Sequence, residues 1–359
     1  MNSSAEFTVL FLRHLLNHIS IYSGYENFIK HLDKENISYK EIFRRRSLKR
    51  FDLYRKSYIT KHNKRKANSI GPFYNPFSYL AEMETLKAAA RFHLKIIHNT
   101  FLEDNHGFLG AYKDKYKFHL IATAHQPVSW WKYMNKDLGC LKDLSLLLTV
   151  TSREQEHFER LMPERVKLVH HGVNTDFFSV KNNISNRAYR VLFVGNWLRD
   201  TEFFERVISR MLQNTKEIFV DMVYSVDMDI NSPIFRLCKY PQVTIHRFIS
   251  NEKLVDLYNN SRLLFLPLKD CTANNSLLEA LACGLPVVTT DLPGIRDYTN
   301  SCNAYYYKNE RDCLEFILET IKDDAVLQER STAASDFIRS NFSLPIVAAE
   351  HANIYRELY

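Results

Sequence analysis

The chain is poor in glycine, carries no cysteine motif and contains no long apolar run. Only nine of its 359 residues are glycine, against a usual share of about 7%, so each glycine is expected where the backbone needs one. The six cysteines include no C-x-x-C pair, and no histidine stands at zinc-finger spacing from them. This predicts reduced thiols rather than disulfides or a metal site. No apolar run approaches the roughly 20 residues that span a bilayer.

The N-terminal residues do not read as a signal peptide. Their short apolar run is followed by Arg13 and His14, and no small-residue cleavage site comes after it. Hydrophobic and charged residues make up 45% and 25% of the chain, as in ordinary globular proteins. We therefore expect a cytoplasmic protein with a large core.

Positive charge is concentrated in one stretch. The formal net charge is +7, and Arg44–Lys66 holds eleven lysines and arginines against a single acid, Asp52. One interpretation is a solvated loop without a partner. The other is contact with an anionic acceptor or with the inner face of the cytoplasmic membrane, to which the protein would be peripheral. No nucleic-acid module accompanies the stretch, so we expect no nucleic-acid partner.

Apolar strands alternate with amphipathic helices through most of the chain. Segments such as FTVLFL, FHLIATAH, YRVLFVGN and RLLFLPL are typical of strands buried on both faces, as in parallel sheets. Helical segments such as YLAEMETLKAAARF and EKLVDLYNN lie between them. Two such sets predict an α/β protein with two doubly wound domains. The polar segment 180–190 marks the break, which gives domains 1–183 and 184–344.

The segment 272–294, TANNSLLEALACGLPVVTTDLPG, predicts a buried helix that starts at a loop. Asn274, Asn275 or Ser276 can serve as its N-cap, and Ser276 with Glu279 fits a capping box. The helix has almost no polar face, and Gly284 marks its end. Its first turn would offer free backbone N–H groups to an anion. The alternative is that Glu279 only caps the helix and the helix only packs.

In open parallel sheets, ligands bind beyond the carboxyl ends of the strands. The residues that directly follow the predicted strands are therefore the first candidates for a site. These residues are Gly24, His125, Ser152, Gly172, Gly195 to Arg199, Arg247 and Asn274 to Glu279.

Four blocks, in order and spacing, resemble those of retaining GT-B glycosyltransferases of family 4: residues 166–178, 191–200, 251–298 and 341–358. The segments IYSGYENFIKHL and IATAHQP resemble the less regular N-terminal blocks. The resemblance implies two Rossmann-like domains facing a central cleft, with the acceptor on the first and a nucleotide-sugar on the second. It also implies a final helix, 345–359, that crosses back to the N-terminal domain, and a role in polysaccharide biosynthesis.

The resemblance implies a donor site around the start of the 272–294 segment. Glu279 matches the second Glu of the E-x7-E motif, whose carboxylate binds the ribose hydroxyls. Backbone N–H groups of residues 274–277 would hold the diphosphate, and the base would pack near 246–249. The donor-binding residues so implied are Gly24, Asn196, Arg247, Phe248, Ala273, Asn274, Asn275, Ser276, Leu277 and Glu279.

Three residues are candidates for catalysis. His125 matches a family His near the reacting carbon, although a lone His is more often structural. Arg199 would neutralise the leaving diphosphate, with a second charge from Arg206 or Arg247; an ion pair of Arg199 with Asp200 or Glu202 is the alternative. The first Glu of the motif falls on Cys271, and Asp270 can substitute for it. Alternatively, backbone groups suffice at this place, the sugar differs, or the chain is an inactive homologue.

The sequence predicts no metal and no cofactor beyond a UDP- or GDP-linked sugar as co-substrate. The D-x-D tripeptide 227–229 resembles the metal signature of another glycosyltransferase fold, but such tripeptides are frequent by chance. We expect a metal-independent, retaining hexosyltransferase acting on a glycan or lipid-linked acceptor. The alternatives are a synthase or phosphorylase of the same architecture and a non-catalytic homologue that binds a glycan or partner protein. A dehydrogenase is disfavoured because no G-x-G-x-x-G follows a predicted strand.

Overall fold

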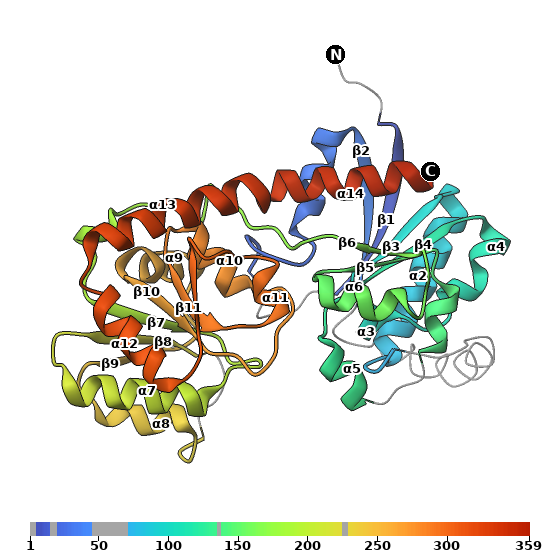
Figure 1. Cartoon of the computed structure of the whole chain (residues 1–359). Coiled ribbons are helices and arrows are strands. Elements are labelled where there is room, and N and C mark those ends of the chain that lie inside the picture. Colours follow the sequence, from blue (N-terminus) through green and yellow to red (C-terminus); the bar gives the residue numbers. More distant parts are fainter. Residues whose placement is uncertain (1–4, 15–19, 45–70, 135–137, 225–228) are drawn as a thin grey trace. The chain divides into compact units, whose positions relative to one another are not determined.

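The computed structural model describes residues 5–14, 20–44, 71–134, 138–224 and 229–359 (Figure 1). The chain forms two compact units. The first contains the described residues up to His14, then Tyr25–His171 and Leu344–Tyr359, and the second contains Ser20–Gly24 and Gly172–Ser343. Each unit is an α/β layer structure built on one parallel sheet of six strands.

The sheet of the first unit has the order β2-β1-β3-β4-β5-β6, with every neighbouring pair parallel. Its strands are β1 (Phe7–Arg13), β2 (Ile37–Phe43), β3 (Ile96–Asn99), β4 (His119–Ala124), β5 (Leu146–Thr149) and β6 (Val166–Leu168). The helices of this unit are η1 (Asn27–Glu35), α2 (Pro76–Phe92), α3 (Leu102–Asn105), η2 (Leu109–Tyr112), α4 (Lys113–Tyr116), α5 (Val128–Met134), η3 (Gly139–Asp143), α6 (Ser152–Glu159) and α14 (Leu344–Leu358).

The continuous apolar run of β1 is explained by burial of both sheet faces. Successive side chains of a strand point to opposite faces. Val9 and Phe11 pack in the cluster that contains η1 and α14, whereas Leu10 and Leu12 pack in the cluster that contains α2. All four side chains are fully buried, as the sequence predicts for a parallel strand covered on both sides.

The sheet of the second unit has the order β12-β11-β10-β7-β8-β9 and is also parallel throughout. Its strands are β7 (Arg190–Val194), β8 (Phe219–Val223), β9 (Val243–His246), β10 (Leu263–Leu266), β11 (Val287–Thr290) and β12 (Ala304–Tyr307). Its helices are η4 (Ile184–Asn186), α7 (Thr201–Asn214), α8 (Pro233–Arg236), η5 (Leu237–Lys239), α9 (Asn251–Asn260), α10 (Asn275–Ala282), α11 (Pro293–Arg296), α12 (Glu310–Thr320) and α13 (Asp324–Asn341).

The division between the units differs from the predicted boundary at residues 183 and 184. The second unit begins at Gly172 and also takes in the short segment Ser20–Gly24. The reason is packing: Val173 and Phe178 are fully buried in the core cluster that surrounds α10. Val173 also pairs with Ser23 and with Ser343 through isolated bridges. The polar stretch 180–190 thus lies inside the second unit rather than linking the two.

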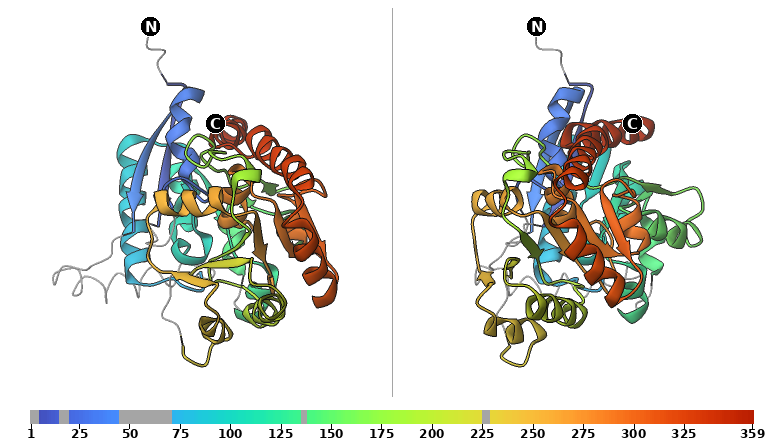
Figure 2. Two further views of the ribbon diagram at one scale, coloured as in Figure 1. Left: turned by 90° about the vertical axis from the view of Figure 1, so that its left-hand side faces the viewer. Right: turned by 60° about the vertical axis from the view of Figure 1, so that its left-hand side comes forward.

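The last helix, α14, belongs to the first unit although the residues before it belong to the second. Its apolar residues Val347, Ala348 and Tyr355 pack in the same cluster as Phe28 of η1. In the turned views of Figure 2, the dark red helix lies beside the blue N-terminal segment of this unit. The return of the chain to the first unit therefore rests on ordinary core packing.

Candidate functional site

Helix α10 starts at a polar loop and is buried along its body. Asn274 is the N-cap, with its side-chain oxygen accepting from the backbone N–H of Leu277 at 3.3 Å. The predicted capping box of Ser276 and Glu279 is wrong, because Glu279 lies inside the helix and its carboxylate faces other partners. Residues 276–282 are buried. Their packing fixes the direction in which the first turn of the helix points.

Arg199 comes from the loop after β7, and its side chain lies beside the start of α10. Its Nη2 donates to the Ser276 hydroxyl at 2.9 Å and lies 3.5 Å from the Asn274 side-chain oxygen. Its Nε donates to the Val194 carbonyl at 2.9 Å. Gly195 makes this approach possible, because a Cβ there would stand 2.9 Å from Nη2 and its φ is +88°. The loop after β7 therefore holds a guanidinium against the helix start.

Arg199 pairs with no carboxylate among the residues that the structure describes. Its acceptors are neutral carbonyl, amide and hydroxyl oxygens. The alternative ion pair with Asp200 is absent there, because the Asp200 side chain caps α7 by accepting from Phe203 N at 3.0 Å. Burial lowers the pKa of Arg199 to about 10, so the group stays charged at neutral pH.

A cation at this place is electrostatically unfavourable without an anion. The N-terminus of α10 carries the positive end of the helix dipole, and the Arg199 guanidinium adds a full charge beside it. The two repel each other, and both attract an anion. The arrangement is therefore suited to a phosphate or diphosphate group.

Glu279 is a buried carboxylate one turn into α10. One of its oxygens accepts a hydrogen bond from the Ser23 hydroxyl, and the other accepts from the Tyr258 hydroxyl at 2.9 Å. Burial raises the pKa of Glu279 to about 7, although both hydroxyls favour the charged form. Sequence reasoning missed Ser23 and Tyr258, because neither a spacing nor a charge pattern links two hydroxyls so far apart in the chain.

Gly24 lies against the start of the same helix. Its φ is +65°, and a Cβ at this position would overlap the side-chain amide of Asn275. Its N–H donates to the Gly172 carbonyl at 2.7 Å. The short segment Ser20–Gly24 thus brings its backbone close to the first turn of α10, which only glycine allows here.

The acidic candidate Asp270 follows β10 and is buried. Its Oδ1 accepts from the backbone N–H of Cys271 at 2.8 Å. Cys271 itself packs in the core of the second unit. The side chain at the position of the first motif Glu is therefore directed into the protein interior, and Asp270 is the carboxylate next to it.

The remaining donor candidates follow other strands of the second sheet. Asn196 follows β7 and is exposed, and Ala273 precedes the N-cap of α10 and is partly buried. Arg247 and Phe248 follow β9, with the guanidinium 5.2 Å from the ring centre and the ring 73% exposed. Arg206, the other suggested second charge, pairs with Glu310 at 3.1 Å.

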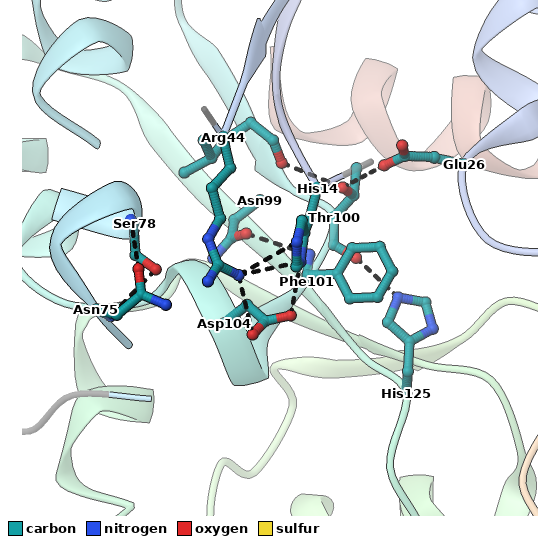
Figure 3. A network of polar contacts seen from close by, with 11 residues as sticks. His14, Glu26, Arg44, Asn75, Ser78, Asn99, Thr100, Phe101, Asp104 and His125 are labelled. Carbon is teal, nitrogen blue, oxygen red and sulfur yellow. Dashed lines mark hydrogen bonds and ion pairs between the residues drawn. The ribbon is translucent and has the colours of Figure 1, made fainter. Parts of the chain in front are cut away.

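His125 lies in the first unit, directly after β4. Its Nε2 donates to the Thr100 carbonyl at 2.7 Å, because a carbonyl can only accept (Figure 3). The Nδ1 atom is 3.2 Å from Nε2 of His171. Glu103 accepts from the backbone N–H of His125 at 2.6 Å. Burial lowers the pKa of His125 to about 4, so the imidazole is neutral and firmly oriented.

His125 borders a small cavity of the first unit. The cavity volume is about 10 Å³, room for roughly one water molecule. Six further residues with titratable side chains line it, namely Tyr25, Glu26, His98, His170, His171 and His351. Sequence reasoning missed them, because these histidines come from separate elements that only the fold brings together. The cavity is too small for a sugar.

Beside the cavity, an ion-pair network closes the end of the sheet. Thr100 donates to Glu26 at 2.5 Å, and Asp104 bonds His14 at 2.8 Å and Arg44 at 3.1 Å (Figure 3). Arg44 is the one residue of the predicted basic stretch that the structure describes. The rest of that stretch, and Asp227 and Met228 of the D-x-D tripeptide, lie outside the described residues.

Membrane-spanning helices and metal clusters are both absent from the described residues. None of the helices described combines the length and hydropathy that a membrane crossing needs. Within the same residues, no three His, Cys, Asp or Glu side chains are grouped so that they could hold a metal ion.

The fold is that of GT-B glycosyltransferases, as predicted. Sucrose-phosphate synthase from Thermosynechococcus elongatus superimposes with a TM-score of 0.70 at 14% identity, over 98% of this chain and 99% of that chain. A glycosyltransferase from Rickettsia africae gives 0.64 at 14% identity, over 98% of both chains. Anabaena HepE, solved with UDP and glucose, gives 0.67 at 12% identity, over 98% and 100%. At such low identities, these structural likenesses show the fold alone.

A family model matches most of the second unit. Residues 188–323 match the family model of glycosyl transferases group 1, a segment that contains Arg199, the start of α10 and Glu279. The chain thus carries a group 1 glycosyltransferase domain and is a glycosyltransferase. No curated protein matches it.

Proposed function

We propose that the protein transfers a sugar, with retention of configuration and without a metal ion, from a UDP- or GDP-linked donor to a glycan or lipid-linked acceptor. The observation that carries the proposal is Arg199, which has neutral hydrogen-bond partners and stands at the start of α10. A diphosphate would bring negative charge to this place. Anabaena HepE has been solved with UDP-glucose, which supports testing UDP-linked donors first.

The residues of the second unit suggest how the donor binds. The diphosphate would accept from the backbone N–H groups of residues 274–277 and from Arg199. The ribose hydroxyls would donate to Glu279, and the base would pack near Arg247 and Phe248. Asn196, Ala273 and Gly24 border this site in the proposal. Since these donors would face the leaving group and be preorganised, the proposal requires no divalent ion to neutralise it.

The proposed chemistry breaks the bond between the sugar and the diphosphate on the face from which the acceptor hydroxyl attacks. The leaving phosphate oxygen takes the acceptor proton, so no strong general base is needed. By resemblance, His125, which is neutral and fixed by Thr100, would act near the reacting carbon, and Asp270 would bind a sugar hydroxyl. The resemblance to family 4 supports these two roles, and it also supports a cytoplasmic setting in polysaccharide biosynthesis with the basic stretch 44–66 facing an anionic membrane.

A second candidate is a non-catalytic homologue that binds a glycan or a partner protein. It is favoured by Cys271, which stands where the family has a carboxylate and is buried in the core.

Donor turnover in a chelator distinguishes the two. The protein is incubated with UDP-glucose, UDP-N-acetylglucosamine and GDP-mannose in EDTA, and nucleotide release and sugar anomers are followed by proton NMR. We expect one donor to be hydrolysed slowly, with the α anomer appearing before mutarotation. A β anomer appearing first contradicts retention, and loss of turnover in EDTA contradicts metal independence. Nucleotide binding without turnover of any donor favours the non-catalytic candidate.

A further inference from the structure

Two hydroxyl groups from distant segments hold the Glu279 carboxylate. Ser23 comes from the segment Ser20–Gly24, and Tyr258 comes from α9, yet each donates to a different oxygen of the same side chain. Both residues are fully buried. The Ser23 backbone is fixed by its bridge to Val173, and the ring of Tyr258 lies 6.1 Å from that of Phe178. The two donors are therefore held by packing.

These contacts use half of the accepting capacity of the carboxylate. An ionised carboxylate has about four lone-pair positions, two on each oxygen. Ser23 and Tyr258 fill one position on each oxygen, which leaves one on each. Two such positions, one per oxygen, match the two hydroxyls of a vicinal diol.

The groups around the carboxylate are also consistent with two further hydroxyl donors. Its two partners are neutral, and Tyr258 remains a donor because burial raises its pKa well above the ordinary value. Arg199 and Cys283 are the other titratable groups that act on this cluster, and neither side chain is hydrogen-bonded to the Glu279 carboxylate. A buried carboxylate with two neutral donors is under-solvated. Two further hydroxyl donors would stabilise its charged form.

We propose that Ser23 and Tyr258 are positioning residues that orient Glu279 so that its two remaining lone pairs accept the 2′- and 3′-hydroxyls of the donor ribose. The proposal rests on the proposed function, because it takes the ligand to be a ribonucleotide donor. Neither residue touches the ribose. Each acts through Glu279, by preventing rotation of the carboxylate and by leaving one acceptor position on each oxygen directed at the diol.

The test compares ribonucleotides with their 2′-deoxy forms. Dissociation constants of UDP, 2′-deoxy-UDP, GDP and 2′-deoxy-GDP are measured in EDTA for the wild type, Tyr258→Phe and Ser23→Ala. A hydrogen bond to a charged group contributes enough for about a tenfold preference for the ribonucleotide in the wild type. We expect the preference to fall to about threefold or less in each variant, as the carboxylate loses its orientation. The KM for the donor rises while kcat changes little.

The matched control is Tyr305→Phe. The Tyr305 hydroxyl also donates to a carboxylate, Asp312 Oδ1 at 2.7 Å, but on α12. This variant should keep the wild-type preference. If Tyr258→Phe fails to fold, Ser23→Ala carries the test, because it removes one small hydroxyl.

The outcomes separate the two proposals. An undiminished preference in both variants overturns the positioning role, even if the variants are less stable, and leaves the donor site intact. A wild type that binds ribonucleotide and 2′-deoxynucleotide equally overturns the ribose contact of Glu279 and the positioning role with it. A wild type that binds no nucleoside diphosphate overturns the proposed function itself.

Discussion

Replacing Arg199 with methionine lowers kcat for sugar transfer about 10²–10³-fold, the usual effect of removing one preorganised donor from a developing negative charge. The side chain is held by the Val194 carbonyl and the Ser276 hydroxyl, so it needs no reorganisation to meet the leaving diphosphate. Methionine keeps much of the side-chain volume and removes the charge. Steady-state kinetics with the donor identified by the turnover assay measures the effect.

Two further variants control this result. Arg199→Lys keeps the charge but loses the planar guanidinium, which donates to Ser276 and to Val194 at the same time. We therefore expect this variant to recover only part of the wild-type kcat. Arg311→Met removes an exposed arginine that pairs with Glu315 on α12, and its kcat should equal that of the wild type. A kcat of Arg199→Met within threefold of the wild type, with an unchanged melting temperature, would remove Arg199 from the mechanism.

Replacing Arg187 with methionine destabilises the second unit by at least about 3 kcal/mol, since it leaves buried carbonyls without donors. Arg187 is buried and donates to the carbonyls of Asn182, Tyr258, Ser261 and Cys283. It thereby joins the ends of α9 and α10 to the segment before β7. Burial lowers its pKa to about 10, so it stays charged at neutral pH.

Urea unfolding measures this effect through the midpoint of the transition that belongs to the second unit. Arg296→Met is the matched control, because Arg296 is an exposed arginine paired with Asp291 at 2.7 Å. Exposed pairs contribute about 0–1 kcal/mol. Equal midpoints for the two variants would show that the carbonyl contacts of Arg187 do not stabilise the unit.

The fold could be predicted because burial of both sheet faces leaves a direct mark on the sequence. The run Val9 to Leu12 has no polar residue, since its alternate side chains enter two different cores. Gly24 and Gly195 could also be predicted as positions that need a glycine. In a glycine-poor chain, a glycine in a loop after a strand indicates a place where a Cβ does not fit. Their exact partners, Asn275 and Arg199, are tertiary contacts that no local pattern encodes.

The site could be predicted in part. The start of α10 and the nearby Arg199 follow from local signals, a polar N-cap before a buried helix and a cation after a strand. The predicted capping role of Glu279 is wrong. Its carboxylate accepts from the hydroxyls of Ser23 and Tyr258, which come from distant segments, instead of from the helix start. The second unit begins earlier than the predicted boundary. A polar composition indicates only that a segment is exposed, whereas the unit to which a segment belongs is decided by its buried residues, here Val173 and Phe178.

The measurement that tests the central claim most directly is calorimetric titration of UDP and GDP, in EDTA, into the wild type and Arg199→Met. The account predicts that one of them binds without a metal ion and that the substitution weakens binding by about tenfold or more, as expected for the loss of a charge-assisted hydrogen bond. Binding that requires magnesium, or that is equally tight in both proteins, would contradict an anion site formed by Arg199 and the start of α10.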